Sequence, residues 1–164
     1  MLPFMTHKIS PDPSLLKRGI WEDLQNEAVN VNQPRLSSSH RYKGLVDYIV
    51  SRYGSAIEIG VGHSPDVAFA LLQKGMRVLA TDIRSFEYSR LKVIMDNIIE
   101  PDFSLYIDAD LIYSLRPPPE LISYMIRLAR RLSTDLIIKP LSSDYLEGQL
   151  IRHGNTTFFL WNHQ

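Results

Sequence analysis

A glycine-containing turn between an apolar strand and a helix constrains the fold of this chain more than any other feature. Residues 56–59 form the strand candidate, and Gly60 and Gly62 follow it directly. A segment with an apolar stripe at helical spacing comes next, and a second apolar run, 78–81, ends at Asp82. Two parallel strands joined by a helix make a βαβ unit. The stretch therefore predicts a parallel sheet, with this turn at the carboxyl end of the first of the two strands.

Each part of the turn suits the binding of an anion or a nucleoside. Glycines let the backbone bend sharply and approach a ligand, and the helix that follows presents free N–H groups at its N-terminus. Ser64 is predicted to cap that helix and Pro65 to lie in its first turn. The two oxygens of Asp82 can accept from both hydroxyls of a ribose. The alternative is a purely structural turn, because a lone Gly-x-Gly is a weak signal.

The residue at position 65 separates two kinds of adenosine-cofactor site. The dinucleotide fingerprint requires a small residue three positions after the second glycine, and Pro65 stands there. The run from Glu58 to Gly62 instead resembles the first motif of Rossmann-like S-adenosylmethionine-dependent methyltransferases. The resemblance implies that Glu58 reaches the amino group of the cofactor's methionine, often through water. It also implies that Asp82 holds the ribose and that Ile83 walls the adenine pocket.

The third strand candidate, 92–97, ends in another acid. In the same superfamily an acid at this place bonds the adenine amino group, which implies adenine contacts for Asp96 and its neighbour Asn97. The alternative is a solvated carboxylate at a strand end. Only 84–91 joins this strand to the previous one, whereas a parallel crossover usually takes about a dozen residues including its helix. The crossover helix is therefore predicted to be short or missing.

The alternation of strands and helices predicts the fold class. Strands are expected at 55–59, 78–82, 92–97, 109–115 and 135–139, helices at 39–53 and 119–132, and a hairpin at 149–161. This pattern predicts an α/β, Rossmann-like three-layer sandwich whose sheet is mostly parallel with an antiparallel C-terminal edge hairpin. We assign the domain to 39–164 and interpret 1–38 as an N-terminal extension that packs on it or forms a lid.

The resemblance to the methyltransferase superfamily covers about 40–162. The glycine turn together with the segment 110–121 is similar to a small, uncharacterised archaeal methyltransferase-like family. Membership of that family would bring no established substrate.

The end of the fourth strand candidate supplies the side chains for a reactive cleft. In an open parallel sheet the ligand lies where the strand order reverses, which brings His63 near Tyr113 and Arg116. Superfamily members that methylate amines carry Asn or Asp followed by Pro-Pro here, and Arg116 only donates hydrogen bonds. Arg116 therefore suits an anionic substrate or the cofactor carboxylate. His63, beside the glycine turn, is a candidate for cofactor binding or for a base. The alternatives are an Arg116 that pairs with an acid or a backbone carbonyl, and a His63 that caps the local backbone.

Composition and length exclude several kinds of site and partner. The 164 residues fit one domain. With no cysteine there is no disulfide and no thiolate metal site, and the histidines show no metal-ligand spacing. The 18 basic and 18 acidic residues balance, so the overall charge does not indicate nucleic acid as a partner. No run of about 18 apolar residues or export signal is evident, so a cytoplasmic protein without membrane contact is expected.

Three functions remain for this chain. The first is S-adenosylmethionine binding with methyl transfer to an unidentified, anionic substrate, with Tyr113 and Arg116 as candidate catalytic residues. The second is a non-catalytic module that binds an adenosine ligand or a protein partner. The third is an NAD-dependent oxidoreductase, against which Pro65 counts.

Overall fold

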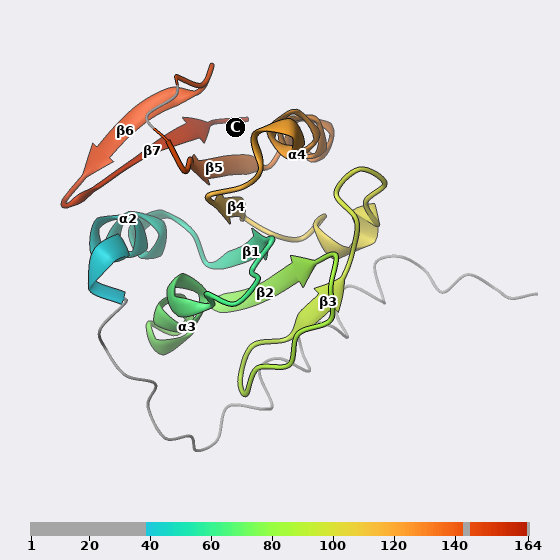
Figure 1. Ribbon diagram of the computed structural model, residues 1–164. Helices are drawn as coiled ribbons and strands as arrows, with labels where there is room; N and C mark the ends of the chain where they lie inside the picture. Colours follow the sequence, from blue (N-terminus) through green and yellow to red (C-terminus); the bar gives the residue numbers. More distant parts are fainter. Residues whose placement is uncertain (1–38, 143–144, 164) are drawn as a thin grey trace, which may run out of the picture.

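A seven-stranded sheet in the order β3-β2-β1-β4-β5-β7-β6 forms the centre of the molecule (Figure 1). The computed structural model describes residues 39–142 and 145–163. The strands are β1 (Ser55–Ile59), β2 (Arg77–Asp82), β3 (Val93–Met95), β4 (Leu111–Leu115), β5 (Asp135–Lys139), β6 (Gln149–His153) and β7 (Thr156–Trp161). The helices are α2 (Lys43–Arg52), α3 (Asp66–Gln73) and α4 (Pro119–Leu132), with 3-10 turns η1 (Ser39–Tyr42) and η2 (Phe103–Leu105).

The first five strands run parallel, and β7 pairs antiparallel with both β5 and β6. The predicted fold class, including the antiparallel C-terminal edge, is confirmed. The expectation for residues 1–38 lies outside the described residues.

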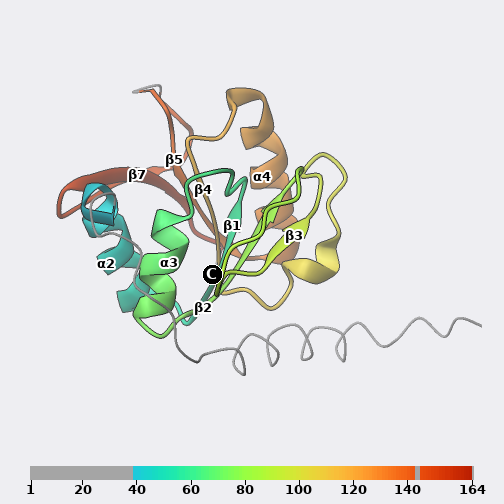
Figure 2. The same ribbon diagram turned by 60° about the horizontal axis from the view of Figure 1, so that its bottom comes forward.

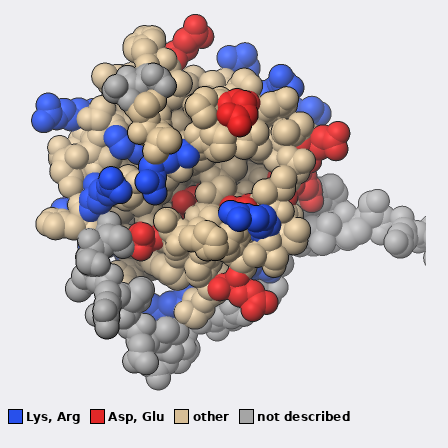
Figure 3. All heavy atoms as spheres, in the orientation of Figure 1, with Lys and Arg blue, Asp and Glu red and all other residues tan. Residues whose placement is uncertain are grey.

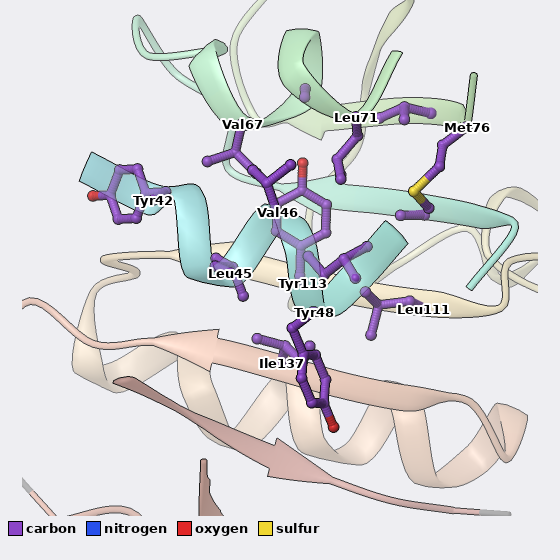
Figure 4. Packing of buried hydrophobic residues seen from close by; sticks show 14 of the residues in the cluster. Tyr42, Leu45, Val46, Tyr48, Val67, Leu71, Met76, Leu111, Tyr113 and Ile137 are labelled. Atoms are coloured by element: carbon purple, nitrogen blue, oxygen red, sulfur yellow. The ribbon is translucent and has the colours of Figure 1, made fainter. Parts of the chain in front are cut away.

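Helices cover both faces of the sheet (Figure 2). On one face α2 and α3 bury Leu45, Ile49 and Leu71 against the strands, and Figure 4 shows this packing around Tyr113 and Ile137. On the other face α4 buries Met125 and Leu128. Because both faces are covered, the central strands are buried along their length instead of alternating between apolar and polar residues.

Two predicted helix starts differ from the structure. Pro65 and not Ser64 lies at the N-cap of α3, and no side chain caps that end. The expected helix from 39 begins as the 3-10 turn η1, and α2 starts only after Tyr42 at its N-cap. At α4 the prediction is confirmed, because Pro118 lies at the N-cap and Pro119 begins the helix.

The connection between β2 and β3 contains no helix, as its length predicted. Residues 83–92 instead form an irregular loop with an isolated bridge between Tyr88 and Leu91. Two strand bounds are corrected here. The third strand ends at Met95, so the acid that was predicted to close it lies just beyond. The fourth strand begins at Leu111 and not at 109, because Asp110 turns away to accept the backbone N–H groups of Gly54 and Ser55.

The turn of the C-terminal hairpin packs on the N-terminal end of α2. Gly154 has φ +54, and Asn155 accepts the Gly44 N–H at 2.8 Å and donates to the His40 carbonyl at 2.9 Å. A Cβ on Gly44 would lie 1.9 Å from the His153 carbonyl oxygen. The absence of a side chain at position 44 therefore allows the hairpin to approach the helix.

Candidate functional site

The strand order reverses between β1 and β4, and a cavity of about 490 Å³ opens at the carboxyl ends of these strands. Its wall combines η1, the glycine turn, the start of α3 and the end of β4. The lining residues are Arg41, Tyr42, Glu58, Gly60, Val61, Gly62, His63, Ser64, Asp66, Val67, Leu115, Arg116 and Leu141. Its size and its place at the topological switch point are those of a small-molecule site in an open parallel sheet.

The glycine turn is held by the end of β2. Gly60 and Gly62 have φ of +75 and +52, a region that favours glycine. The Gly60 N–H donates to the Thr81 carbonyl at 2.8 Å, and the Gly62 N–H donates to Asp82 Oδ2 at 2.9 Å. The other oxygen of Asp82 accepts the Arg84 N–H at 3.0 Å. The acid predicted to hold a ribose therefore also fixes the turn, and it lies outside the lining of the cavity.

Glu58 is an acid at the floor of the cavity with only 1% of its surface exposed. The buried Tyr113 hydroxyl donates to its Oε2 at 2.8 Å. The pKa of Glu58 is raised to about 8, mainly by burial and to a smaller extent by the charge of Asp66, while the hydrogen bond from Tyr113 acts in the opposite direction. Burial and the neighbouring carboxyl also raise the pKa of Tyr113. Tyr113 thus orients Glu58 from beneath and does not line the cavity.

Cationic side chains lie above this acidic floor. Arg41 and Arg116 line the cavity, and the pKa of Lys139 is lowered by burial and by the charge of Arg41. None of the three makes an ion pair with another described residue. Figure 3 shows Lys and Arg side chains gathered beside a hollow on this face. The cavity therefore joins a buried acid to a cationic rim, which complements a ligand that carries both charges.

Arg116 has an unusual backbone conformation that fixes its position. Its φ is +51, and its N–H donates to the Lys139 carbonyl at 2.6 Å. Pro117 and Pro118 follow, and each restricts its own φ. Strain of this kind in a residue other than glycine occurs preferentially at functional sites. The alternative in which Arg116 pairs with Glu58 or Glu120 is not observed in the described part of the chain.

Three further predicted site residues lie at the neighbouring strand ends, outside the lining of the cavity: Ile83, Asp96 and Asn97. Ile83 is 65% exposed directly after Asp82. Asp96 accepts from the Tyr106 hydroxyl at 2.6 Å and from the Asp102 N–H at 3.0 Å, and Asn97 accepts the Ile99 N–H. His63 does line the cavity, and its ring lies 5.0 Å from that of Phe86.

Sequence reasoning missed several residues around the site. The Tyr88 hydroxyl donates to the Gly62 carbonyl at 2.5 Å, and its ring contacts Phe69. Tyr106 joins Asp96 to β2 through the Thr81 hydroxyl, 3.1 Å away. Arg41 reaches the cavity from before the first strand. The aromatic spacing in the helix-free loop was the only signal for Tyr88, and no local pattern marks the other two.

Two solved methyltransferase structures have a fold similar to that of this chain. An RNA methyltransferase from Salinibacter ruber in complex with S-adenosyl-L-homocysteine superposes with a TM-score of 0.51, at 12% identity, over 80% of this chain and 92% of that one. The sugar N-methyltransferase KedS8 from Streptoalloteichus gives a TM-score of 0.50 at 13% identity, over 76% of this chain and 63% of that longer one. The chain thus has a methyltransferase-like Rossmann fold.

The family follows from closer relatives. Residues 43–163 match the model of the uncharacterised protein family UPF0146, and this chain belongs to that family. A UPF0146 protein from Archaeoglobus fulgidus is 39% identical over 120 residues, which cover 71% of this chain and 91% of the relative. A UPF0146 protein from Pyrococcus horikoshii is 36% identical over 117 residues, which cover 67% of this chain and 89% of the relative. The resemblance to a small archaeal methyltransferase-like family is confirmed.

Among the described helices, none has the length and apolar character to span a bilayer.

Proposed function

We propose that this protein binds S-adenosylmethionine in the cavity at the glycine turn and transfers its methyl group to a second substrate. The observation that carries the proposal is the pairing of a buried acid, Glu58, with the cations of the rim in one cavity at the switch point of a methyltransferase-like sheet. The methionine part of the cofactor is a zwitterion with an ammonium and a carboxylate group. Glu58 matches the first group once it is ionised, and an ammonium placed beside it favours the ionised form. Arg41 matches the second group.

The residues on the next two strand ends extend this arrangement toward the nucleoside. Asp82 lies directly beyond the turn and keeps further acceptor capacity, because each carboxylate oxygen accepts only one of the hydrogen bonds described above. The exposed side chain of Ile83 offers an apolar surface to the adenine, with Asp96 and Asn97 at the adjacent strand end. These four residues are our proposed contacts to ribose and adenine.

In the proposed reaction a lone pair of the substrate forms a bond to the methyl carbon, and the carbon–sulfur bond breaks with its electron pair on sulfur. S-adenosylhomocysteine is the second product. The protein's main contribution is alignment of the two reactants. Tyr113 is in our proposal a positioning residue for Glu58, since its hydroxyl is buried against that carboxyl. Arg116 contacts the substrate.

Calorimetric titration with S-adenosylmethionine, S-adenosylhomocysteine and NAD tests the cofactor. We expect the first two to bind and NAD not to bind. Glu58→Gln keeps an acceptor for Tyr113 but cannot ionise, so at pH 8.5, above the pKa of about 8, it should weaken binding by about tenfold or more. Glu120→Gln, an exposed acid on the first turn of α4, is the matched control and should bind normally.

The outcomes separate the three candidate functions. Binding of S-adenosylhomocysteine that is insensitive to Glu58→Gln would remove the zwitterion argument. Binding of NAD alone would favour an oxidoreductase. Cofactor binding without methyl transfer to any candidate substrate would favour the non-catalytic module, whose partner would then be a protein.

A further inference from the structure

We propose that the methyl acceptor is a small amphipathic anion, whose apolar body lies in a groove between α4 and the segment after β5 and whose anionic group binds Arg116. This inference rests on the proposed function, because it names the substrate class of the same site.

The groove is a second cavity of about 390 Å³ on the α4 side of the strand ends. Prolines, aliphatic side chains and aromatic rings form most of its wall, among them Pro117, Pro119, Ile122, Ile126, Tyr145 and Trp161. Tyr145 remains 80% exposed. A cavity of this volume is at the lower end of the range for small-molecule sites, about 300–1,000 Å³. Its size and lining suit an acyl chain or an aromatic ring better than a macromolecule.

The groove and the proposed cofactor cavity are adjacent. Leu141 lines both of them and is 72% exposed. Arg116 lines the cofactor cavity, and the next residue, Pro117, lines the groove. A molecule in the groove therefore has one end beside the place where the methyl group would be presented.

The charges at this junction favour a negative group on the occupant. Arg116 pairs with no described acid, and its backbone is bonded to Lys139 at the end of the next strand. Lys139 ends β5 and is paired with Leu115 of β4, and Arg116 is the residue after Leu115. The cations Arg116 and Lys139 therefore lie at neighbouring strand ends. A guanidinium binds a carboxylate or a phosphate through two parallel hydrogen bonds.

The charged residues around the two cavities determine which way the occupant of the groove is oriented. Glu147 lines the groove, so the apolar body and not the anionic group is assigned there. Arg41 lines the cofactor cavity from η1 and does not line the groove, so we assign it to the cofactor carboxylate. Arg116 lines the cofactor cavity directly before the groove-lining Pro117, so it is the cation that an acceptor in the groove meets.

The test uses the fluorescence of Trp161, which lines the groove. The chain has two tryptophans, so Trp21→Phe leaves Trp161 as the single reporter. The full-length variant is titrated with four probes of equal chain length: octanoate, octyl phosphate, 1-octanol and octyltrimethylammonium. We expect a saturable change with the two anions, at an affinity about tenfold above that for octanol, and the weakest binding for the cation.

Substitutions at two positions test where the anionic group of the probe binds. Arg116→Gln should bring the affinity for octanoate down to that for octanol. Ser123→Glu adds a negative charge on an exposed position of the groove wall and should weaken octanoate binding, while the neutral Ser123→Gln should not. Because Ser123 is exposed, this pair tests the groove even if Arg116→Gln fails to fold.

Equal affinities for octanoate and octanol in the parent protein would overturn the anion assignment. No fluorescence change with any probe would overturn the groove, and if S-adenosylhomocysteine still binds, the proposed function stands without it. Anion binding without S-adenosylhomocysteine binding would overturn the reading of this site as a methyl-acceptor site.

Discussion

At the scale of single residues, the protonation of Glu58 links the site to stability. Its pKa is about 8 in the folded protein, against an ordinary value of 4.5, because the carboxyl is buried. Between these two pH values the unfolded chain loses the proton and the folded chain keeps it. The free energy of unfolding therefore falls as the pH rises, by about 1.4 kcal/mol per pH unit for this one group. Below pH 4.5 this contribution is fully present, and above pH 8 it is lost.

Glu58→Gln should remove this slope, because the amide is neutral at every pH. The measurement is urea unfolding of the parent and the variant at intervals from pH 5 to 8.5, with the difference in free energy plotted against pH. Glu120→Gln should retain the parent slope, since Glu58 is intact. A difference between parent and Glu58→Gln that does not change with pH would show that Glu58 is ionised in the folded protein.

The sequence predicted residue types at the site better than their contacts. Gly60, Gly62 and Glu58 follow from a local pattern, and the structure brings them together around one cavity. The bonds from Asp82 to the glycine turn depend on two strands that pair in the fold, which no local pattern encodes. The same holds for Tyr113, whose hydroxyl is directed to Glu58 only because β1 and β4 are neighbours in register.

At the scale of elements, the predictions succeeded where chain length or periodicity decides the outcome. The loop from 83 to 92 is too short for a crossover helix, and the structure has none. The bounds of β3 and β4 were less predictable because polar contacts end the strands. Asp96 is turned toward Tyr106, and Asp110 toward the start of β1. Such contacts come from residues far apart in the sequence.

The contact between α2 and the C-terminal hairpin gives a prediction at this scale. Gly44→Ala places a Cβ 1.9 Å from the His153 carbonyl oxygen, a backbone atom that cannot rotate away. Although alanine favours a helix over glycine by about 1 kcal/mol, we expect a net loss of stability of about 1–3 kcal/mol, the usual cost of overpacking. Thermal or urea unfolding measures the change.

Ser51→Ala is the control for Gly44→Ala, since Ser51 is exposed on the same helix and its hydroxyl makes only local hydrogen bonds, with the Tyr48 carbonyl and Arg52. It should change stability by less than about 0.5 kcal/mol. An equal or higher stability for Gly44→Ala would show that the hairpin turn does not approach α2 as closely as described.

At the scale of the whole molecule, the described part of the chain closes both faces of the sheet. The buried clusters on the two faces are built from residues between Tyr42 and Trp161. The family match begins at residue 43 and ends at 163. The described residues therefore provide a hydrophobic core on each face, as a three-layer fold requires, and the domain start near 39 stays a prediction.

Removal of residues 1–38 tests this domain boundary. Because the described residues form a buried cluster on each face of the sheet, the 39–164 fragment should unfold cooperatively with a Tm within about 2–4 °C of the full chain, a shift that corresponds to about 1 kcal/mol at roughly this chain length. The fragment should also bind S-adenosylhomocysteine as the full chain does, since it retains all the described residues that line the proposed cofactor cavity. If the extension is instead a lid over the substrate, methyl transfer falls in the fragment while cofactor binding is kept. Loss of cooperative unfolding would mean that the first 38 residues belong to the fold itself, because the described layers would then be insufficient to hold the sheet.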